Sequence, residues 1–427
     1  MSELRTAIEQ VFRREAGRII AGLIRVSQSF DLAEEAMQDA FTSALVDWEK
    51  KGIPANPAAW INTVARRKLV DYARRDRTRR GNQDQLLYES GQRAVTEHEC
   101  ITGSACEEMD FPDDRLRLIF TCCHPALNTE AQVGLTLHTL GGLTTPEIAR
   151  AFLVPESTLA QRLVRAKRKI REARIPYEIP PAEALPDRLA AVQAVIYLVF
   201  NEGYSATAGD SLVRRELCAE AIRLARTLHE LLPGEPEVAG LLALMLLHDS
   251  RRDSRVNDAG ELVPLEDQNR STWHAQQIAE GIRLLENALR MGNAGPYQLQ
   301  AAIAAVHAEA RTAAQTDWKQ IAELYELLAR KNRSSVIALN HAVAVAMCEG
   351  IATGLEQIHR LGASGELDSY YLYHAARADL LRRLGRKDEA LAAYDRALSL
   401  TTNAVERRYL RRRIAEVQSE GRPLESD

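Results

Sequence analysis

The sequence predicts an all-α protein built from several domains. Only 5% of its 427 residues are aromatic, whereas alanine and leucine are plentiful, and this composition favours helices over sheets. Apolar residues recur at three- and four-residue steps along much of the chain, and proline or glycine interrupts them. A chain of this length holds roughly two to four domains, each able to bury its own core.

The first clear helical stripe covers residues 31–48. Its apolar side consists of Ala33, Ala36, Met37, Ala40, Phe41, Ala44, Leu45 and Trp48. The opposite side of its first two turns carries Asp31, Glu34, Glu35, Gln38 and Asp39. From composition alone, the more common interpretation is a solvated face whose acids lie near the positive end of the helix dipole. The alternative is an acidic docking surface for a basic partner.

A break at residues 52–57 separates this stripe from a basic helix. Asn56 caps the new helix, and Pro57 occupies its first position. The buried side consists of Trp60, Ile61, Val64, Ala65, Leu69 and Tyr72. Residues 66–80 hold eight Lys or Arg and two Asp. Cations follow phosphates and aromatic rings stack on bases, so this stretch suits single-stranded nucleic acid; a solvated basic helix end is the alternative.

The charge then reverses. Between residues 82 and 114 there are nine Asp or Glu and a single Arg, and Gly, Ser and Thr are common. We therefore predict an acidic linker over residues 81–112, for which a solubilising tether is the simplest role.

Residues 143–174 are typical of a helix-turn-helix. Thr144 or Thr145 can cap a first helix, and Pro155 interrupts the pattern before a second helix. The second helix is expected to start at Ser157 or Thr158, and its apolar positions are Leu159, Leu163, Ala166 and Ile170. Its other face carries Gln161, Arg162, Arg165, Lys167, Arg168, Lys169, Arg171 and Arg174. A helix of about fifteen residues is ~22 Å long and fits the major groove of DNA.

The long C-terminal half follows a hinge marked by prolines between residues 176 and 186 and consists of successive amphipathic helices. Residues 370–400 fit one tetratricopeptide repeat, with small or aromatic side chains at Ala378, Gly385, Ala390, Tyr394 and Ala397. The segment around Ala322, Tyr325 and Ala329 repeats the second half of such a unit. A polar, turn-like stretch at residues 251–273 lies between them, and loops of this kind often carry function.

Three motifs in this order resemble the extracytoplasmic-function class of bacterial RNA polymerase sigma factors. The class motif A-E-D-x-x-Q-E-x-F is similar to AEEAMQDAF at residues 33–41. The motif W-L-x-x-I-A-R-N-x-x-x-D-Y-x-R-R is similar to the segment at 59–75, and V-P-x-G-T-V-x-S-R-L-x-R-A-R to the segment at 154–167. The C-terminal half resembles the extension of one subgroup, which typically has Q-D-R where this chain has Gln268, Asn269 and Arg270.

The resemblance implies a domain order and a role for each motif. It implies sigma region 2 at residues 1–80, the linker at 81–112, region 4 at 113–176 and a tetratricopeptide-like domain at 186–427. The implied core-polymerase surface is Glu34, Glu35, Gln38 and Asp39. The implied −10 residues are Trp60, Arg66, Arg67, Asp71, Tyr72, Arg74 and Arg75, next to a base turned out of the stack. The implied −35 residues are Ser157, Thr158, Gln161, Arg162, Arg165 and Lys169.

Two positions depart from the class patterns. Arg67 stands where the class has Asn, which bears on the single-strand contact, and Ser157 stands where it has Gly. The resemblance further implies that the linker threads toward the RNA exit channel, and that the C-terminal domain modulates activity or binds a protein or peptide.

The alternative function is a stand-alone helix-turn-helix regulator with a tetratricopeptide sensor, which leaves residues 33–75 without a purpose. An enzyme is not favoured, because the sequence offers no glycine-rich nucleotide loop, nucleophile–base pair or metal cluster. Cys122, Cys123 and His124 cannot complete a tetrahedral metal site alone, so we expect packing there, and we expect no cofactor. Cys100 and Cys106 lie in the linker, and nothing around them predicts a lowered thiol pKa.

The polar residues Asn201, Glu202 and Tyr204 form a candidate small site, for which an interhelical network is the simpler interpretation. The formal net charge of −4 gives the whole chain no general attraction to nucleic acid. Residues 1–25 do not form a secretory signal, and the apolar run 241–247 is too short for a bilayer. We therefore expect a cytoplasmic protein with reduced thiols, associated with core polymerase and promoter DNA and not with a membrane.

Overall fold

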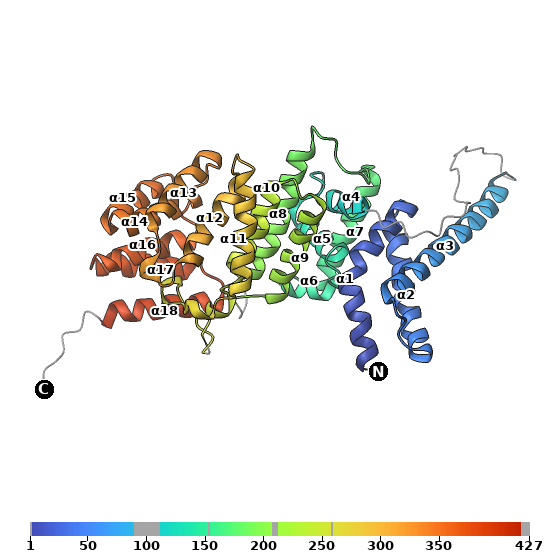
Figure 1. Ribbon diagram of the computed structural model, residues 1–427, viewed down its shortest axis with the longest axis horizontal. Helices are drawn as coiled ribbons and strands as arrows, with labels where there is room; N and C mark the ends of the chain where they lie inside the picture. Colours follow the sequence, from blue (N-terminus) through green and yellow to red (C-terminus); the bar gives the residue numbers. More distant parts are fainter. Residues whose placement is uncertain (1, 89–111, 153, 207–211, 258, 420–427) are drawn as a thin grey trace. The chain divides into compact units, whose positions relative to one another are not determined.

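The computed structural model describes residues 2–88, 112–152, 154–206, 212–257 and 259–419. These residues form α-helices joined by turns and short 3-10 segments, and their single β-bridge joins Val256 to Leu262 (Figure 1). The predicted all-α class is confirmed. No helix among these residues is long and apolar enough to cross a membrane.

The chain divides into two compact units, 1–195 and 196–427. The first unit contains α1 (Ser2–Ser27), α2 (Phe30–Lys51), α3 (Pro57–Tyr88), α4 (Pro112–Cys122), α5 (Thr129–Thr139), α6 (Thr145–Ala151) and α7 (Glu156–Glu172). The unit boundary falls within α8 (Leu185–Tyr204). Because α3 continues to Tyr88, it extends into the range 81–112 that the sequence analysis assigned to the linker. Residues 89–111, with Cys100 and Cys106, lie outside the described part of the chain.

The first unit is organised around α1, which packs against α2, α3, α4 and α5. The approach to α5 is close, because a Cβ on Gly17 would lie 2.9 Å from the carbonyl oxygen of Leu140. The guanidinium Nε of Arg25 lies 2.9 Å from Oδ2 of the buried Asp114, at the start of α4. The two regions that the linker was expected to separate therefore form one compact unit.

The second unit is an array of helices in which each packs on its neighbours, as Figure 1 shows for α11 to α17. Beyond α8 it contains α9 (Arg215–Leu231), α10 (Pro236–Asp249), α11 (Ala275–Arg290), α12 (Pro296–Glu309), α13 (Trp318–Lys331), α14 (Ser335–Glu349), α15 (Ile351–Gly362), α16 (Tyr371–Arg383), α17 (Lys387–Leu400) and α18 (Ala404–Ser419). Short 3-10 segments lie at Arg252–Ser254, Leu265–Asp267, Arg270–Thr272 and Ala313–Gln315.

The helix pair predicted at residues 370–400 is present as α16 and α17. Ala378, Ala390, Tyr394 and Ala397 are buried between them and their neighbours, and Gly385 adopts φ +72° in the connecting turn. Small side chains also bring α14 and α15 together, since a Cβ on Gly354 would lie 2.3 Å from that of Ala346. The paired-helix packing is confirmed, and its assignment to the tetratricopeptide class stays a prediction.

Candidate nucleic-acid and polymerase interface

The helix-turn-helix is formed by α6 and α7. Thr144 caps α6 with a complete capping box, in which its side chain accepts from the N–H of Glu147 and Glu147 accepts from the N–H of Thr144. The expected start of the second helix was wrong: α7 begins at Glu156, and its N-cap is Pro155, which makes no side-chain cap. Since Pro155 already combines φ −58° with an extended ψ of 139°, neither Ser157 nor Thr158 is needed as a cap, and both lie within the first turn.

One side of α7 is buried and the other presents the predicted −35 residues. The buried stripe is the predicted one, Leu159, Leu163, Ala166 and Ile170. Ser157, Gln161, Arg165 and Lys169 are exposed, whereas Thr158 and Arg162 are half-buried. Arg162 pairs with Glu130 of α5 at 3.0 Å. Within the described part of the chain, Arg165 and Lys169 make no ion pair, so their charges are available to phosphates.

The predicted −10 residues lie on α3, where Asn56 caps the helix by accepting from the N–H of Ala59. Trp60 is half-buried and packs edge-on against Trp48 of α2, with ring centroids 5.5 Å apart. Arg67 and Asp71 are exposed, and Arg66 is half-buried. The side chains of Arg74 and Arg75 lie outside the described residues.

The four predicted polymerase-docking residues on α2 lie in three different environments. Glu35 and Gln38 are exposed. Asp39 is held from α3, since the hydroxyl of Tyr72 donates to its Oδ2 at 2.5 Å and Nζ of Lys68 lies 3.9 Å from the same oxygen. The stripe behind them is buried as predicted except at Leu45, which is 43% exposed because it lies at the edge of the stripe.

Glu34 instead contacts the helix-turn-helix. Its Oε2 binds Nζ of Lys167 on α7, and its Oε1 lies 3.8 Å from Nε2 of His138 on α5. A second ion pair joins Arg171 of α7 to Asp31 of α2 at 3.4 Å. We name these four residues of α2 and α7, Asp31, Glu34, Lys167 and Arg171, the clasp. The sequence analysis placed each of them on a charged helix face but gave no signal that the two faces meet.

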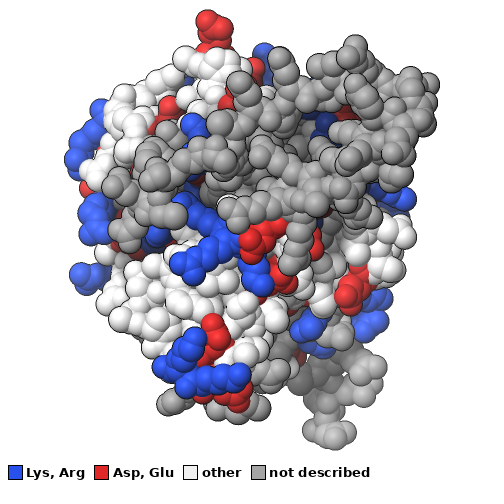
Figure 2. All heavy atoms as spheres, turned by 90° about the vertical axis from the view of Figure 1, so that its right-hand side faces the viewer, with Lys and Arg blue, Asp and Glu red and all other residues white. Residues whose placement is uncertain are grey.

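Opposite charges also lie side by side elsewhere. On the face of the molecule drawn in Figure 2, Lys and Arg occur next to Asp and Glu instead of forming one continuous basic surface. This pattern agrees with the net charge of −4. Attraction to DNA therefore has to come from local faces such as that of α7.

The cysteines next to His124 are packed inside the first unit, as expected. Cys122 and Cys123 are both buried, and burial raises the pKa of the Cys123 thiol to about 11. Sγ of Cys123 lies 3.5 Å from the Thr136 hydroxyl, and His124 accepts from the N–H of Ala126. Among the residues that the structure describes, no group of three or more His, Cys, Asp and Glu could hold a metal ion.

In the second unit, the residues 201–204 do not converge on one site. Asn201 is exposed, and Glu202 forms an ion pair with Arg214 at 2.7 Å. Tyr204 turns toward a different set of side chains, on the polar stretch 251–273.

Comparisons with known protein families identify three segments. Residues 11–79 match the family model for sigma-70 region 2, and residues 117–170 match that for sigma-70 region 4. Residues 188–289 match a family of unknown function, DUF6596. No solved structure matches the chain.

Curated relatives extend the match. The chain is 44% identical over 401 residues to "Uncharacterized protein R00370" of Rhizobium meliloti, covering 94% of this chain and 93% of the relative. It is 26% identical over 179 residues to "Probable ECF RNA polymerase sigma factor SigI" of Mycobacterium tuberculosis, which covers 41% of this chain and 58% of that protein. The chain therefore belongs to the same family as the Rhizobium protein along nearly its whole length, and it is an RNA polymerase sigma factor whose regions 2 and 4 and C-terminal extension fit the extracytoplasmic-function type.

Proposed function

We propose that the first unit docks on core polymerase through α2, holds the −10 element on α3 and reads the −35 element with α7. The observation that supports this most is α7 itself. Its apolar stripe is buried in packing, and Gln161, Arg165 and Lys169 lie on its exposed side. On the polymerase side, Glu35 and Gln38 are exposed on α2 beside the clasp.

The test is reconstituted transcription. Purified full-length protein is added to bacterial core polymerase and a promoter library, and run-off transcripts are sequenced. A sigma factor produces transcripts that share two upstream elements, and none form without core polymerase. Binding to DNA without initiation would instead support the stand-alone regulator, which does not use region 2.

The residue roles are separated by matched variants in the same assay. Arg165→Ala is expected to reduce initiation only at promoters that depend on the −35 element, because it removes a cation from the exposed face of α7. Arg168→Ala is the control, since Arg168 is also exposed on α7 but pairs with Glu172 at 3.6 Å. Equal losses in the two variants would show that the −35 assignment is wrong.

For the second unit we propose a non-enzymatic, modulating role, in which the helical array alters initiation or binds a protein or peptide. A chain ending after α8 tests this while preserving the bond from Arg188 to the carbonyl of Phe120, which ties the start of α8 to α4. Unchanged initiation and unchanged regulation in cells by this shortened chain would refute the role. Since core polymerase and promoter DNA are the proposed partners, the protein is expected to act in the cytoplasm.

A further inference from the structure

The segment that connects α10 to α11 is much longer than is needed to join these two helices. It runs from Ser250 to His274, far beyond the roughly 2–8 residues usual between packed helices. Its two ends are tied together, because the N–H of His274 donates to the carbonyl of Ser250 at 2.8 Å. A short connection at this point would join the same helices. We call residues 250–274 the arginine loop, since Arg251, Arg252, Arg255 and Arg270 lie in it.

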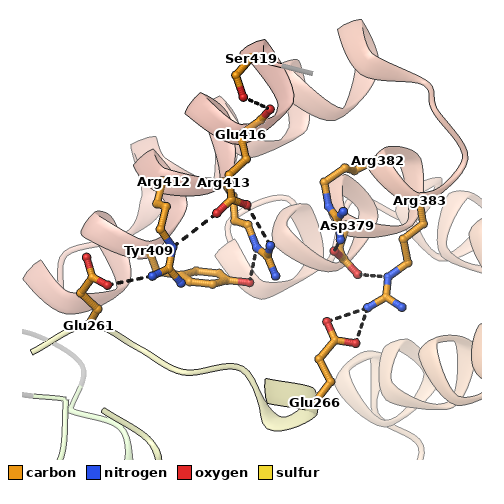
Figure 3. A network of polar contacts seen from close by, with 10 residues as sticks. All are labelled: Glu261, Glu266, Asp379, Arg382, Arg383, Tyr409, Arg412, Arg413, Glu416 and Ser419. Carbon is orange, nitrogen blue, oxygen red and sulfur yellow. Dashed lines mark hydrogen bonds and ion pairs between the residues drawn. The ribbon is translucent and has the colours of Figure 1, made fainter. Parts of the chain in front are cut away.

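The arginine loop is fixed to the far helices of its own unit, as Figure 3 shows. Glu261 pairs with Arg412 of α18 at 2.9 Å. Both carboxylate oxygens of Glu266 accept from Nη2 of Arg383 on α16, at 2.9 and 2.8 Å. Each pair is partly exposed and worth little alone, but two anchors on different helices restrict the loop together.

A third anchor is Arg270, which binds the end of α12. Its guanidinium donates to the carbonyls of His307 and Ala310 and to the hydroxyl of Thr316. These acceptors are neutral, so none of them offsets the positive charge of Arg270. Arg252 is neutralised differently, by an ion pair with the buried Asp249.

The other two arginines lie over the ring of Tyr204. The guanidinium carbon of Arg255 is 3.7 Å from the ring centroid, and that of Arg251 is 5.6 Å away. Arg255 also donates to the carbonyl of Tyr204, and Nη2 of Arg251 lies 3.4 Å from Nδ1 of His248. Neither guanidinium has a carboxylate within ion-pair distance in the part of the chain that the structure describes.

The neighbouring titratable groups do not balance this charge. Burial, with Arg251 nearby, lowers the pKa of His248 well below its usual range and that of His307 to about 4, so both rings are neutral. Glu406 of α18 faces Arg255, but its carboxylate accepts from the hydroxyl of Tyr371. Burial raises the pKa of Glu406, which weakens it as a counter-charge.

Several polar atoms on the arginine loop and beside it are buried without a hydrogen-bond partner among the described residues. They include the Tyr204 hydroxyl, Nε of Arg270 and the indole N–H of Trp273, together with the acceptors Oδ1 of Asp249 and Oε1 of Gln268. Buried polar atoms that lack a partner destabilise the protein, so a ligand that pairs with them is favoured. Two guanidinium groups without a carboxylate partner, next to the unpaired hydroxyl of Tyr204, favour a negatively charged group that accepts hydrogen bonds.

We propose that Arg251, Arg255 and Tyr204, on the fixed arginine loop and the end of α8, bind the oxyanion group of a small soluble ligand. Carboxylate and phosphate share the required chemistry, since both present paired oxygens to the guanidinium fork. The loop's anchors hold the two guanidinium groups in place before the ligand arrives, which reduces the cost of ordering them. This site lies wholly in the second unit and does not depend on the promoter-reading roles proposed above.

Calorimetric titration of the full-length protein with citrate and with inorganic phosphate, at ionic strength matched by sodium chloride, tests the proposal. If only citrate binds saturably, the ligand group is a carboxylate. If only phosphate binds saturably, the ligand group is a phosphate. Arg251→Gln is expected to weaken binding by about tenfold or more, because it removes a charge-assisted hydrogen bond. Arg333→Gln, which alters an exposed arginine between α13 and α14, is the control and is expected to bind as the unchanged protein does.

Two further measurements test the proposal even if Arg251→Gln does not fold. Arg251→Lys keeps the charge but loses the guanidinium fork, and an intermediate affinity is expected. In the unchanged protein, the better-bound anion should slow amide hydrogen exchange at residues 248–256. Failure of both anions to bind saturably, or equal weakening by Arg251→Gln and Arg333→Gln, would overturn the proposal and leave the arginines as packing around Tyr204.

Discussion

Replacing Lys167 by Gln should strengthen binding to core polymerase. Lys167 is not one of the predicted −35 residues, but its Nζ binds Glu34, one of the predicted docking residues. While the clasp is closed, that carboxylate is unavailable to polymerase. The apparent affinity is therefore the intrinsic affinity reduced by the fraction of open molecules.

The magnitude follows from burial. The side chains of Lys167 and Glu34 are only 12% and 22% exposed, so removing the lysine leaves a largely desolvated carboxylate without its partner. The second pair, Arg171 and Asp31, is 69% and 61% exposed and contributes little. A closed form weakened by about 1–2 kcal/mol shifts the open population about five- to thirtyfold. The core affinity should increase by the same factor until the open form predominates.

Fluorescence titration of labelled full-length protein with core polymerase measures this directly. Arg168→Gln is the matched control, because it also removes one positive charge from α7. Arg168 pairs with Glu172, and the two side chains are 60% and 63% exposed. The clasp would be refuted as a restraint on docking if folded Lys167→Gln bound core polymerase no more tightly than the original protein. The control Arg168→Gln has to bind core polymerase as the original protein does.

Four other outcomes are expected. Replacing the exposed Glu35 and Gln38 by Ala should weaken binding to core polymerase about tenfold or more in the same titration, since neither residue belongs to the clasp. No change in affinity would contradict docking through α2. The double variant Arg165→Ala, Lys169→Ala should bind −35 duplex DNA with a weaker salt dependence. The slope of the logarithm of the association constant against that of the salt concentration should fall by about one unit per lost phosphate contact, and an unchanged slope would show that the two residues do not contact DNA. Gly354→Ala should destabilise the second unit by about 1–3 kcal/mol in denaturant unfolding, because its Cβ would lie 2.6 Å from the carbonyl of Ala342, whereas Gly234→Ala meets nothing within 4 Å and should be neutral. Since burial lowers the pKa of His307 to about 4, the unfolded chain takes up a proton there first, and this histidine alone should lower the stability by about 2 kcal/mol between pH 7.5 and 5. His307→Gln should remove that share of the loss, whereas the share from His248, whose pKa is also lowered, should remain.

Features governed by local rules could be predicted from the sequence. The capping box at Thr144, the cap at Asn56 and the buried stripe of α7 each depend on residues within one or two helical turns. The α16–α17 pair was predictable for the same reason, because small residues at helical spacing and a glycine in the turn are all that its packing requires.

The remaining features depend on contacts between distant residues. The clasp joins side chains more than 130 positions apart, and the faces that meet in it are each consistent with simple solvation. The hydroxyl of Tyr177 likewise lies 2.9 Å from the carbonyl of Ala21 on α1, which no local pattern indicates. The arginine loop was visible as a polar stretch, but its anchors at Arg383 and Arg412 lie over 100 residues away, so these contacts were not predictable.

Under the proposed docking through Glu34, the clasp would couple polymerase docking to the charge that α7 offers to DNA. When Glu34 is released to polymerase, Lys167 loses its partner and joins Arg165 and Lys169 as an available cation on α7, whereas Arg171 keeps its pair with Asp31. Coupling between two binding events is reciprocal, so any DNA contact made by the freed Lys167 favours the docked form by the same factor. We infer that the closed form reduces the affinity for free DNA, because Lys167 stays paired until polymerase binds the carboxylate of Glu34.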